Sequence, residues 1–102
     1  MIIIETTLPD QTFAKEISTL LIEKKLAACV HMFQIESVYS WDNKIENTHE
    51  ILLRIKSEKR LFLEIKDVIS NHHPYDIPEI IATPIIESNE KYTNWLKTSL
   101  KN

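Results

Sequence analysis

The sequence predicts an α+β fold, and three observations support this. Four segments are β-branched or alternate apolar with polar residues, as strands do, and three others carry apolar residues at helical spacing. Their order is strand, helix, strand, strand, helix, strand, and then a last helix. With right-handed crossovers, this order most simply gives a ferredoxin-like βαββαβ sandwich, and residues 1–102 fit one domain.

The first strand and helix are predicted from residues 1–26. Residues 1–8 are apolar and β-branched, so we expect a buried strand there. Pro9 ends it, and Asp10 is placed to cap a helix that ends near Leu26. This helix should bury the apolar stripe of Phe13, Ile17, Leu20 and Leu21.

A long hairpin follows, with predicted arms at residues 28–41 and 45–56. Asn43 lies in its turn and tolerates a positive φ better than other residues except glycine. The apolar positions of the first arm change phase between Phe33 and Ile35, which indicates a bend or a bulge. The second arm should face the core with Ile51, Leu53 and Ile55.

The second half contains a helix, a strand and a helix. Residues 58–71 form an amphipathic pattern, and residues 79–87 read as a strand. Because Pro84 has no N–H to donate, that strand should lie at an edge or contain a bulge. A short helix over residues 89–100 should follow, capped by Ser88 or Asn89.

The hairpin is too long for a compact single subunit. Arms of about a dozen residues, at about 3.3 Å each, span roughly 40 Å, whereas a domain of about 100 residues has a radius of gyration near 13 Å. Its tip carries Val38, Tyr39, Trp41 and Ile45. Exposed apolar surface beside unpaired strand edges favours pairing with further copies, so we predict a homo-oligomer. The alternative is a tip that is simply solvated.

The composition excludes several classes of function. Net charge is −3 with interleaved signs, which argues against nucleic acid or an anionic membrane as a partner. No apolar run approaches the roughly 20 residues of a spanning helix, and we recognise no signal peptide. The single cysteine excludes an intrachain disulfide and favours the cytoplasm. Because the chain has no glycine, it lacks the glycine-rich loops that cradle nucleotide phosphates.

Four segments together resemble one family. They are LAACV at residues 26–30, SVYSW at 37–41, HPYDIPEI at 73–80 and YTNWL at 92–96. Nearly end to end, the chain is similar to the CutA family of divalent-cation tolerance proteins. The resemblance implies a ferredoxin-like fold, a homotrimer with strand pairing between subunits, and a role in tolerance of metals such as copper. It implies no enzymatic reaction.

Two positions depart from the family pattern. Asn43 stands where the family usually has glycine, and it keeps the turn feasible. His31 stands where asparagine is usual, and it adds a candidate metal ligand.

The candidate metal ligands are Cys29, His31 and His73. Cys29 and His31 are two apart on a strand, so they share a face at roughly 7 Å. A thiolate and an imidazole suit copper or another divalent cation, and we expect no organic cofactor. His49 is excluded as a third ligand if the arms pair so that it faces Ser37, far from His31. The alternative is that Cys29 is a small buried apolar residue.

Residues 72–80, HHPYDIPEI, form a loop because prolines exclude a helix. One interpretation is that His73, Tyr75 and Glu79 line a cleft. The other is that the prolines stiffen the loop while Tyr75 anchors it, with its ring buried and its hydroxyl bonded. These interpretations are compatible.

Aromatic residues suggest a pocket between subunits. The family resemblance implies such a pocket, and the aromatics also suit plain interface packing. The predicted pocket comprises Tyr39, Trp41, Lys56, His73, Tyr75, Glu79, Tyr92 and Trp95.

The sequence favours a binding protein over an enzyme. Nothing forces the environments of two carboxylates apart, and Cys29 is not at a helix N-terminus that would activate it. Our leading hypothesis is a cytoplasmic homotrimer that binds copper and supports metal tolerance. The alternative is a signalling or scaffold trimer whose clefts bind a small anionic metabolite or a protein partner, as Lys56 suggests. A thiol-dependent enzyme would need a reactive Cys29.

Overall fold

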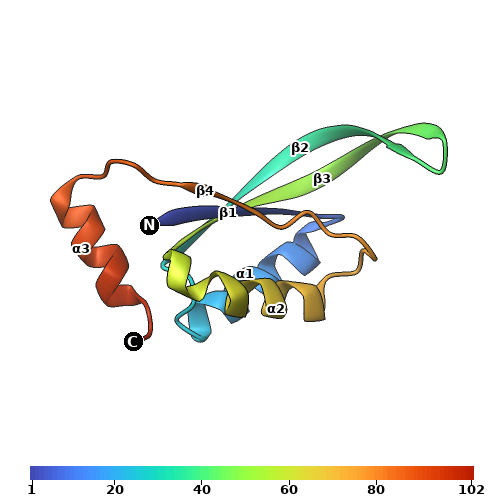
Figure 1. Cartoon of the computed structure of the whole chain (residues 1–102). Coiled ribbons are helices and arrows are strands. Elements are labelled where there is room, and N and C mark those ends of the chain that lie inside the picture. The colour runs from blue at the N-terminus through green and yellow to red at the C-terminus, as the bar shows by residue number, and fades with distance from the viewer.

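Helices cover the sheet on one face only. A computed structural model describes residues 1–102. The antiparallel sheet has the strand order β2-β3-β1-β4, and α1 and α2 lie beside each other under it (Figure 1). The elements are β1 (Ile2–Leu8), α1 (Gln11–Glu23), β2 (Cys29–Trp41), β3 (Lys44–Ser57), a 3-10 turn (Lys59–Leu61), α2 (Phe62–His72), β4 (Ile81–Pro84) and α3 (Glu90–Ser99). The predicted ferredoxin-like fold is confirmed.

The core lies between the sheet and the two helices. Alternate residues of β1 are buried against the helices, and so are the predicted Ile51, Leu53 and Ile55 of β3. The helices contribute Ile17 and Leu21 from α1 and Ile65 and Ile69 from α2. This two-layer core explains the periods of two and 3.6 residues in the sequence.

The ends of the helices are set without glycine. Asp10 caps α1 as predicted, since its Oδ1 accepts from the Phe13 N–H at 3.0 Å. The helix ends at Glu23, before the predicted end near Leu26, because Lys25 takes a positive φ of 56° and turns the chain. Asn89 precedes α3 as predicted, but its side chain makes no capping bond.

The β2–β3 hairpin is paired without interruption from Cys29↔Lys56 to Trp41↔Lys44. Of the two predicted alternatives, the bulge is absent, and the ribbon bends and twists instead (Figure 1). The apolar phase changes because the outer half of the hairpin has no helix beneath it. Asp42 and Asn43 form a two-residue turn with positive φ values of 51° and 61°, as type I′ turns require, so the expectation for Asn43 is confirmed.

The hairpin extends well past the rest of the molecule (Figure 1), whose extents are 46 × 26 × 21 Å. Its outer part exposes apolar side chains: Ile45 is 83% exposed, Val38 67% and Trp41 48%. The predicted overhang is therefore present in the single chain.

The strand β4 lies at the sheet edge, as Pro84 predicts, but it is shorter than the predicted 79–87. Its partner β1 starts at Ile2, which pairs with Pro84, the last residue of β4. Beyond it, the Ile85 N–H donates to the carbonyl of Met1 at 3.0 Å. None of the three α-helices has the length and apolar character that would let it cross a bilayer.

Candidate functional site

The face of the sheet that carries no helix holds most candidate residues. Cys29 is paired with Lys56, and His31 with Arg54. Because paired residues, and residues two apart on a strand, point to the same side of a sheet, these four side chains lie on one face. The prediction that Cys29 and His31 share a face is confirmed. We call this surface the open face; further along the hairpin it also includes Glu50.

The proline loop is fixed by three hydrogen bonds. The backbone N–H of Tyr75 donates to Nδ1 of His73 at 3.2 Å, which leaves Nε2 to carry the proton. Nε2 lies 2.8 Å from the carbonyl of Thr7, to which it therefore donates. The hydroxyl of Tyr75 donates to Oε2 of Glu50 at 2.8 Å. The hydroxyl of Tyr75 is bonded as the anchor interpretation predicts, but its side chain is half-buried and not buried.

These contacts shift the acid–base properties of the loop. Burial lowers the pKa of His73, and this outweighs the opposing effects of the Thr7 carbonyl and of Glu50. Burial, followed by the hydrogen bond to Glu50, raises the pKa of Tyr75. Near neutral pH, Tyr75 is thus a donor facing a carboxylate, and the neutral form of His73 is favoured.

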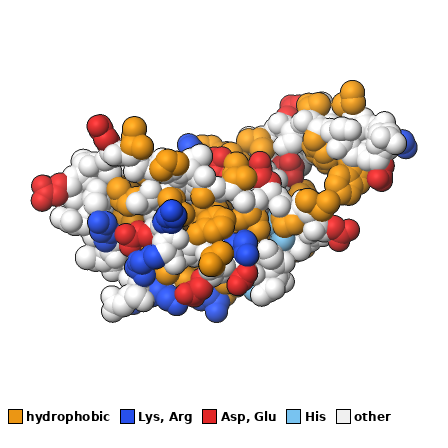
Figure 2. Space-filling model, viewed as in Figure 1, with side chains coloured by type: hydrophobic (Ala, Val, Ile, Leu, Met, Phe, Trp, Pro, Cys, Tyr) orange, Lys and Arg blue, Asp and Glu red, His pale blue; other side chains and the backbone are white.

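A cavity of about 750 Å³ lies between this loop and the open face of the hairpin. Figure 2 shows hydrophobic and acidic side chains alternating where the hairpin leaves the body. The lining includes four residues of the predicted pocket, namely Tyr39, Trp41, Tyr75 and Glu79. It also includes Glu50 and Asp76. The loop thus both anchors the chain and walls a cleft.

Of the other four members of the predicted pocket, His73 lies beside Tyr75 without lining the cavity, and three form a second group. Lys56 Nζ lies 3.3 Å from the hydroxyl of Tyr92 and 5.1 Å from the centre of its ring. The rings of Tyr92 and Trp95 are 5.4 Å apart. Lys56 lies toward the inner end of β3, whereas Glu50 lies further out along the hairpin. Within one chain, therefore, the predicted pocket is split in two.

The predicted metal ligands do not converge within one subunit. No three His, Cys, Asp or Glu side chains of residues 1–102 are grouped to hold a metal ion. Cys29 and His31 share β2, but His73 lies on the loop against Thr7, and both of its ring nitrogens are hydrogen-bonded. A metal site would therefore need ligands from another copy.

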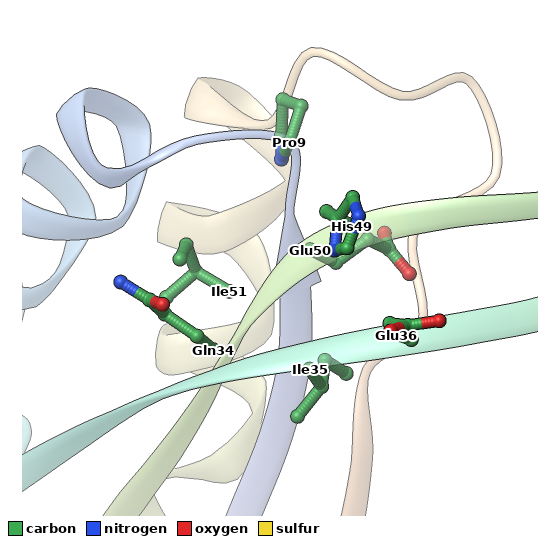
Figure 3. A pocket seen from close by; sticks show the side chains of 7 residues that line it. All are labelled: Pro9, Gln34, Ile35, Glu36, His49, Glu50 and Ile51. Carbon is green, nitrogen blue, oxygen red and sulfur yellow. The ribbon is translucent and has the colours of Figure 1, made fainter.

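The predicted partner of His49 was wrong. His49 lies opposite Glu36 and not Ser37, because the hairpin turn contains two residues, Asp42 and Asn43. This register places His49 on the face opposite to His31, which excludes it as a third ligand even more firmly. His49, Glu36 and Pro9 instead line a separate hollow of about 610 Å³ (Figure 3).

Sequence reasoning missed Glu50. It is only 7% exposed, it is the partner of Tyr75, and it lines both hollows. The sequence feature that could have identified Glu50 is its position directly before the apolar run Ile51-Leu52-Leu53. A charge at that point needs a partner, and the register would have placed it on the open face.

Comparisons with known proteins agree with the fold. A family model described as CutA1 divalent ion tolerance protein matches residues 2–99. The chain is 38% identical over 102 residues to "Protein CutA, chloroplastic" of Arabidopsis thaliana, covering 99% of this chain and 56% of the relative. It is 37% identical over 92 residues to "Divalent-cation tolerance protein CutA" of Thermus thermophilus, covering 89% of each. The chain thus spans little more than half of the plant relative.

A solved structure shows the same architecture. The periplasmic divalent cation tolerance protein CutA from Archaeoglobus fulgidus superimposes with a TM-score of 0.96 at 34% sequence identity. The superposition covers 99% of this chain and 100% of the other.

The first prediction concerns the Tyr75–Glu50 hydrogen bond. Tyr75→Phe should lower the free energy of unfolding by about 1–3 kcal/mol, because a buried carboxylate oxygen loses its donor. In a Glu50→Gln background the same change should cost less, since the acceptor is no longer charged. Chemical denaturation measures both. The control is Tyr39→Phe, whose hydroxyl makes no hydrogen bond; an equal loss there would contradict the assignment.

The second prediction concerns pH. The pKa of His73 is lower in the folded chain than its ordinary value of 6.5, which applies in the unfolded chain. The unfolded state therefore binds more protons between these values, so stability should fall as pH drops from about 8 through 6.5 and level off below the folded pKa. His73→Gln should remove this dependence. An unchanged slope in His73→Gln would assign the effect to other groups.

Proposed function

Because the chain belongs to the CutA1 divalent ion tolerance family, we propose that it is a homotrimer that binds copper and supports tolerance of divalent metals. The family match over residues 2–99 carries the proposal. Metal tolerance through binding needs no covalent change in a substrate, and we propose a binding protein and not an enzyme.

The ligand chemistry supports copper or a similar ion. Cys29 is partly exposed on the open face, and His31 is exposed two residues further along the same strand. Thiolate and imidazole are the preferred ligands of copper and zinc. A thiolate and one imidazole leave the coordination incomplete, and an equivalent face of a second subunit would supply the rest.

The free edges of the sheet support the trimer. In the order β2-β3-β1-β4, the strands β2 and β4 have no outer partner. Pairing β2 of one subunit with β4 of the next joins two different edges, and such a head-to-tail contact forms a closed ring where the rotation between successive copies is one third of a turn. It would also cover the exposed apolar residues of the hairpin.

The compartment belongs to the proposal as well. A lone thiol suits the reducing cytoplasm. The plant relative is named chloroplastic and the archaeal structure periplasmic, so relatives occupy other compartments.

Lys56 favours a second candidate function. It contacts Tyr92 but pairs with no carboxylate, so its charge is available to a ligand. A signalling or scaffold trimer would bind a small anionic metabolite or a protein partner there.

Calorimetric titration tests the metal proposal. The wild-type protein should bind Cu(II), and Zn(II) as a redox-inert probe, saturably at about pH 7. The double variant Cys29→Ser, His31→Ala should lose at least about tenfold in affinity. The control, His72→Ala, removes an exposed imidazole on α2 and should change nothing. Absence of saturable binding by the wild type would contradict the proposal.

A further inference from the structure

We propose that α3 is a latch that opens and closes over one end of the fold while the sheet and the other two helices stay folded. Figure 1 shows α3 outside the two-layer body, at the end opposite the tip of the hairpin. The latch uses none of the candidate metal ligands and none of the residues that line the cavity beside residues 73–80. Its consequence, regulated access to Lys56, rests on the second candidate function.

The connection before α3 has the features of a hinge. The last backbone hydrogen bond that joins this end of the chain to the sheet runs from the Ile85 N–H to the carbonyl of Met1, at 3.0 Å. Residues 86–89 are exposed, and they make hydrogen bonds only with each other and with α3. Exposed backbone that is not bonded to the body opposes a rotation of α3 only weakly.

The apolar attachment of α3 to the body is small. Of residues 85–102, only Leu96 and Leu100 are buried. They are four apart and therefore lie on one side of the helix, whereas Trp95 beside them is 47% exposed. The other fourteen residues of the hydrophobic core all precede residue 70. The body therefore keeps its own core when α3 leaves it.

A clamp on the helix layer closes the latch. The backbone N–H of Lys101 donates to the carbonyl of Lys25 at 2.9 Å, and the Lys101 carbonyl accepts from Nη2 of Arg60 at 2.6 Å. The ammonium of Lys101 lies 2.9 Å from Oε2 of Glu64. These bonds tie the chain just after α3 to the end of α1, the 3-10 turn and α2. Because the charged side chains are half exposed, the clamp can break without unfolding the body.

The closed latch places Tyr92 on Lys56. The ammonium lies 3.3 Å from the hydroxyl and 5.1 Å from the centre of the ring. No other hydrogen bond joins α3 itself to the body. Opening breaks this contact and frees the ammonium, so the latch regulates how far an anion can reach Lys56.

Amide hydrogen exchange of the full chain, followed by NMR at about pH 7, tests the latch. A latch opens as one unit, so the amides of α3 should share one protection factor and exchange at least about tenfold faster than those of Leu53 and Ile55 in β3. Guanidinium below the unfolding transition should accelerate α3 exchange with a slope above zero and below that of β3. The slope is intermediate because opening exposes only part of the buried surface.

Variants locate the clamp. Arg60→Gln should speed α3 exchange at least about threefold and leave β3 unchanged, because the charge-assisted hydrogen bond to the Lys101 carbonyl is lost. Glu58→Gln removes only the ion pair of Arg60, and Lys59→Gln removes an exposed charge next to it. Both controls should exchange like the wild type. The exchange of β3 reports folding in every variant.

Acetylation by an amine-reactive ester, read by mass spectrometry on the assembled protein, tests the consequence for Lys56. This lysine should react at least about twofold faster in Arg60→Gln than in the wild type, because the open state is more populated. Lys15, an exposed lysine of α1, should react equally in both proteins.

Four results would overturn the proposal. Equal exchange of α3 and β3 amides would show that α3 opens only with the whole fold, as it would if a neighbouring copy fastened it. Protection that declines residue by residue toward the C-terminus, without a response to guanidinium, would mean fraying. Unchanged exchange in Arg60→Gln would contradict the clamp, and unchanged acetylation of Lys56 would contradict the regulation. The latch can open whether or not Lys56 binds an anion, so this proposal and the second candidate function fail separately.

Discussion

Two helices of 13 and 11 residues cannot cover a sheet whose β2–β3 hairpin extends far beyond them. The strand β1 has 7 residues, whereas β2 has 13 and β3 has 14. The helices bury the part of the sheet in which β1 pairs with β3. Most of the outer hairpin therefore remains exposed inside one subunit, and on the open face only Tyr92 and the loop of residues 73–80 contact the sheet. Each candidate site described above lies on this uncovered part.

The proline loop compensates for the short β1. Where β1 ends, residues 73–80 approach the hairpin and fix their position through Thr7 and Glu50. This contact creates the cavity, because it holds a stiff wall opposite the open face. It also buries Glu50, whose Oε2 accepts the hydrogen bond from Tyr75. The contacts of the loop with Thr7 and Glu50 thus both stabilise the fold and form the cavity.

Most of the fold was predictable from the sequence because each element satisfies a local rule. Asp10 caps a helix, Asn43 allows the turn, and alternating apolar residues define the core strands. The register of the hairpin was misjudged because Asp42 also adopts a positive φ. The site was harder to predict, since Glu50 meets Tyr75 only through the tertiary fold. Lys56 and Trp41 were predicted to line one pocket, but they lie in separate groups within one chain.

We propose that other copies of the chain cover the exposed hairpin. Light scattering coupled to size-exclusion chromatography tests it most directly, at micromolar protein concentration and physiological salt. The account predicts a single species with three times the 12.0 kDa mass of one chain. A stable, monodisperse species of 12.0 kDa would contradict it, because the apolar hairpin would then be soluble without a partner.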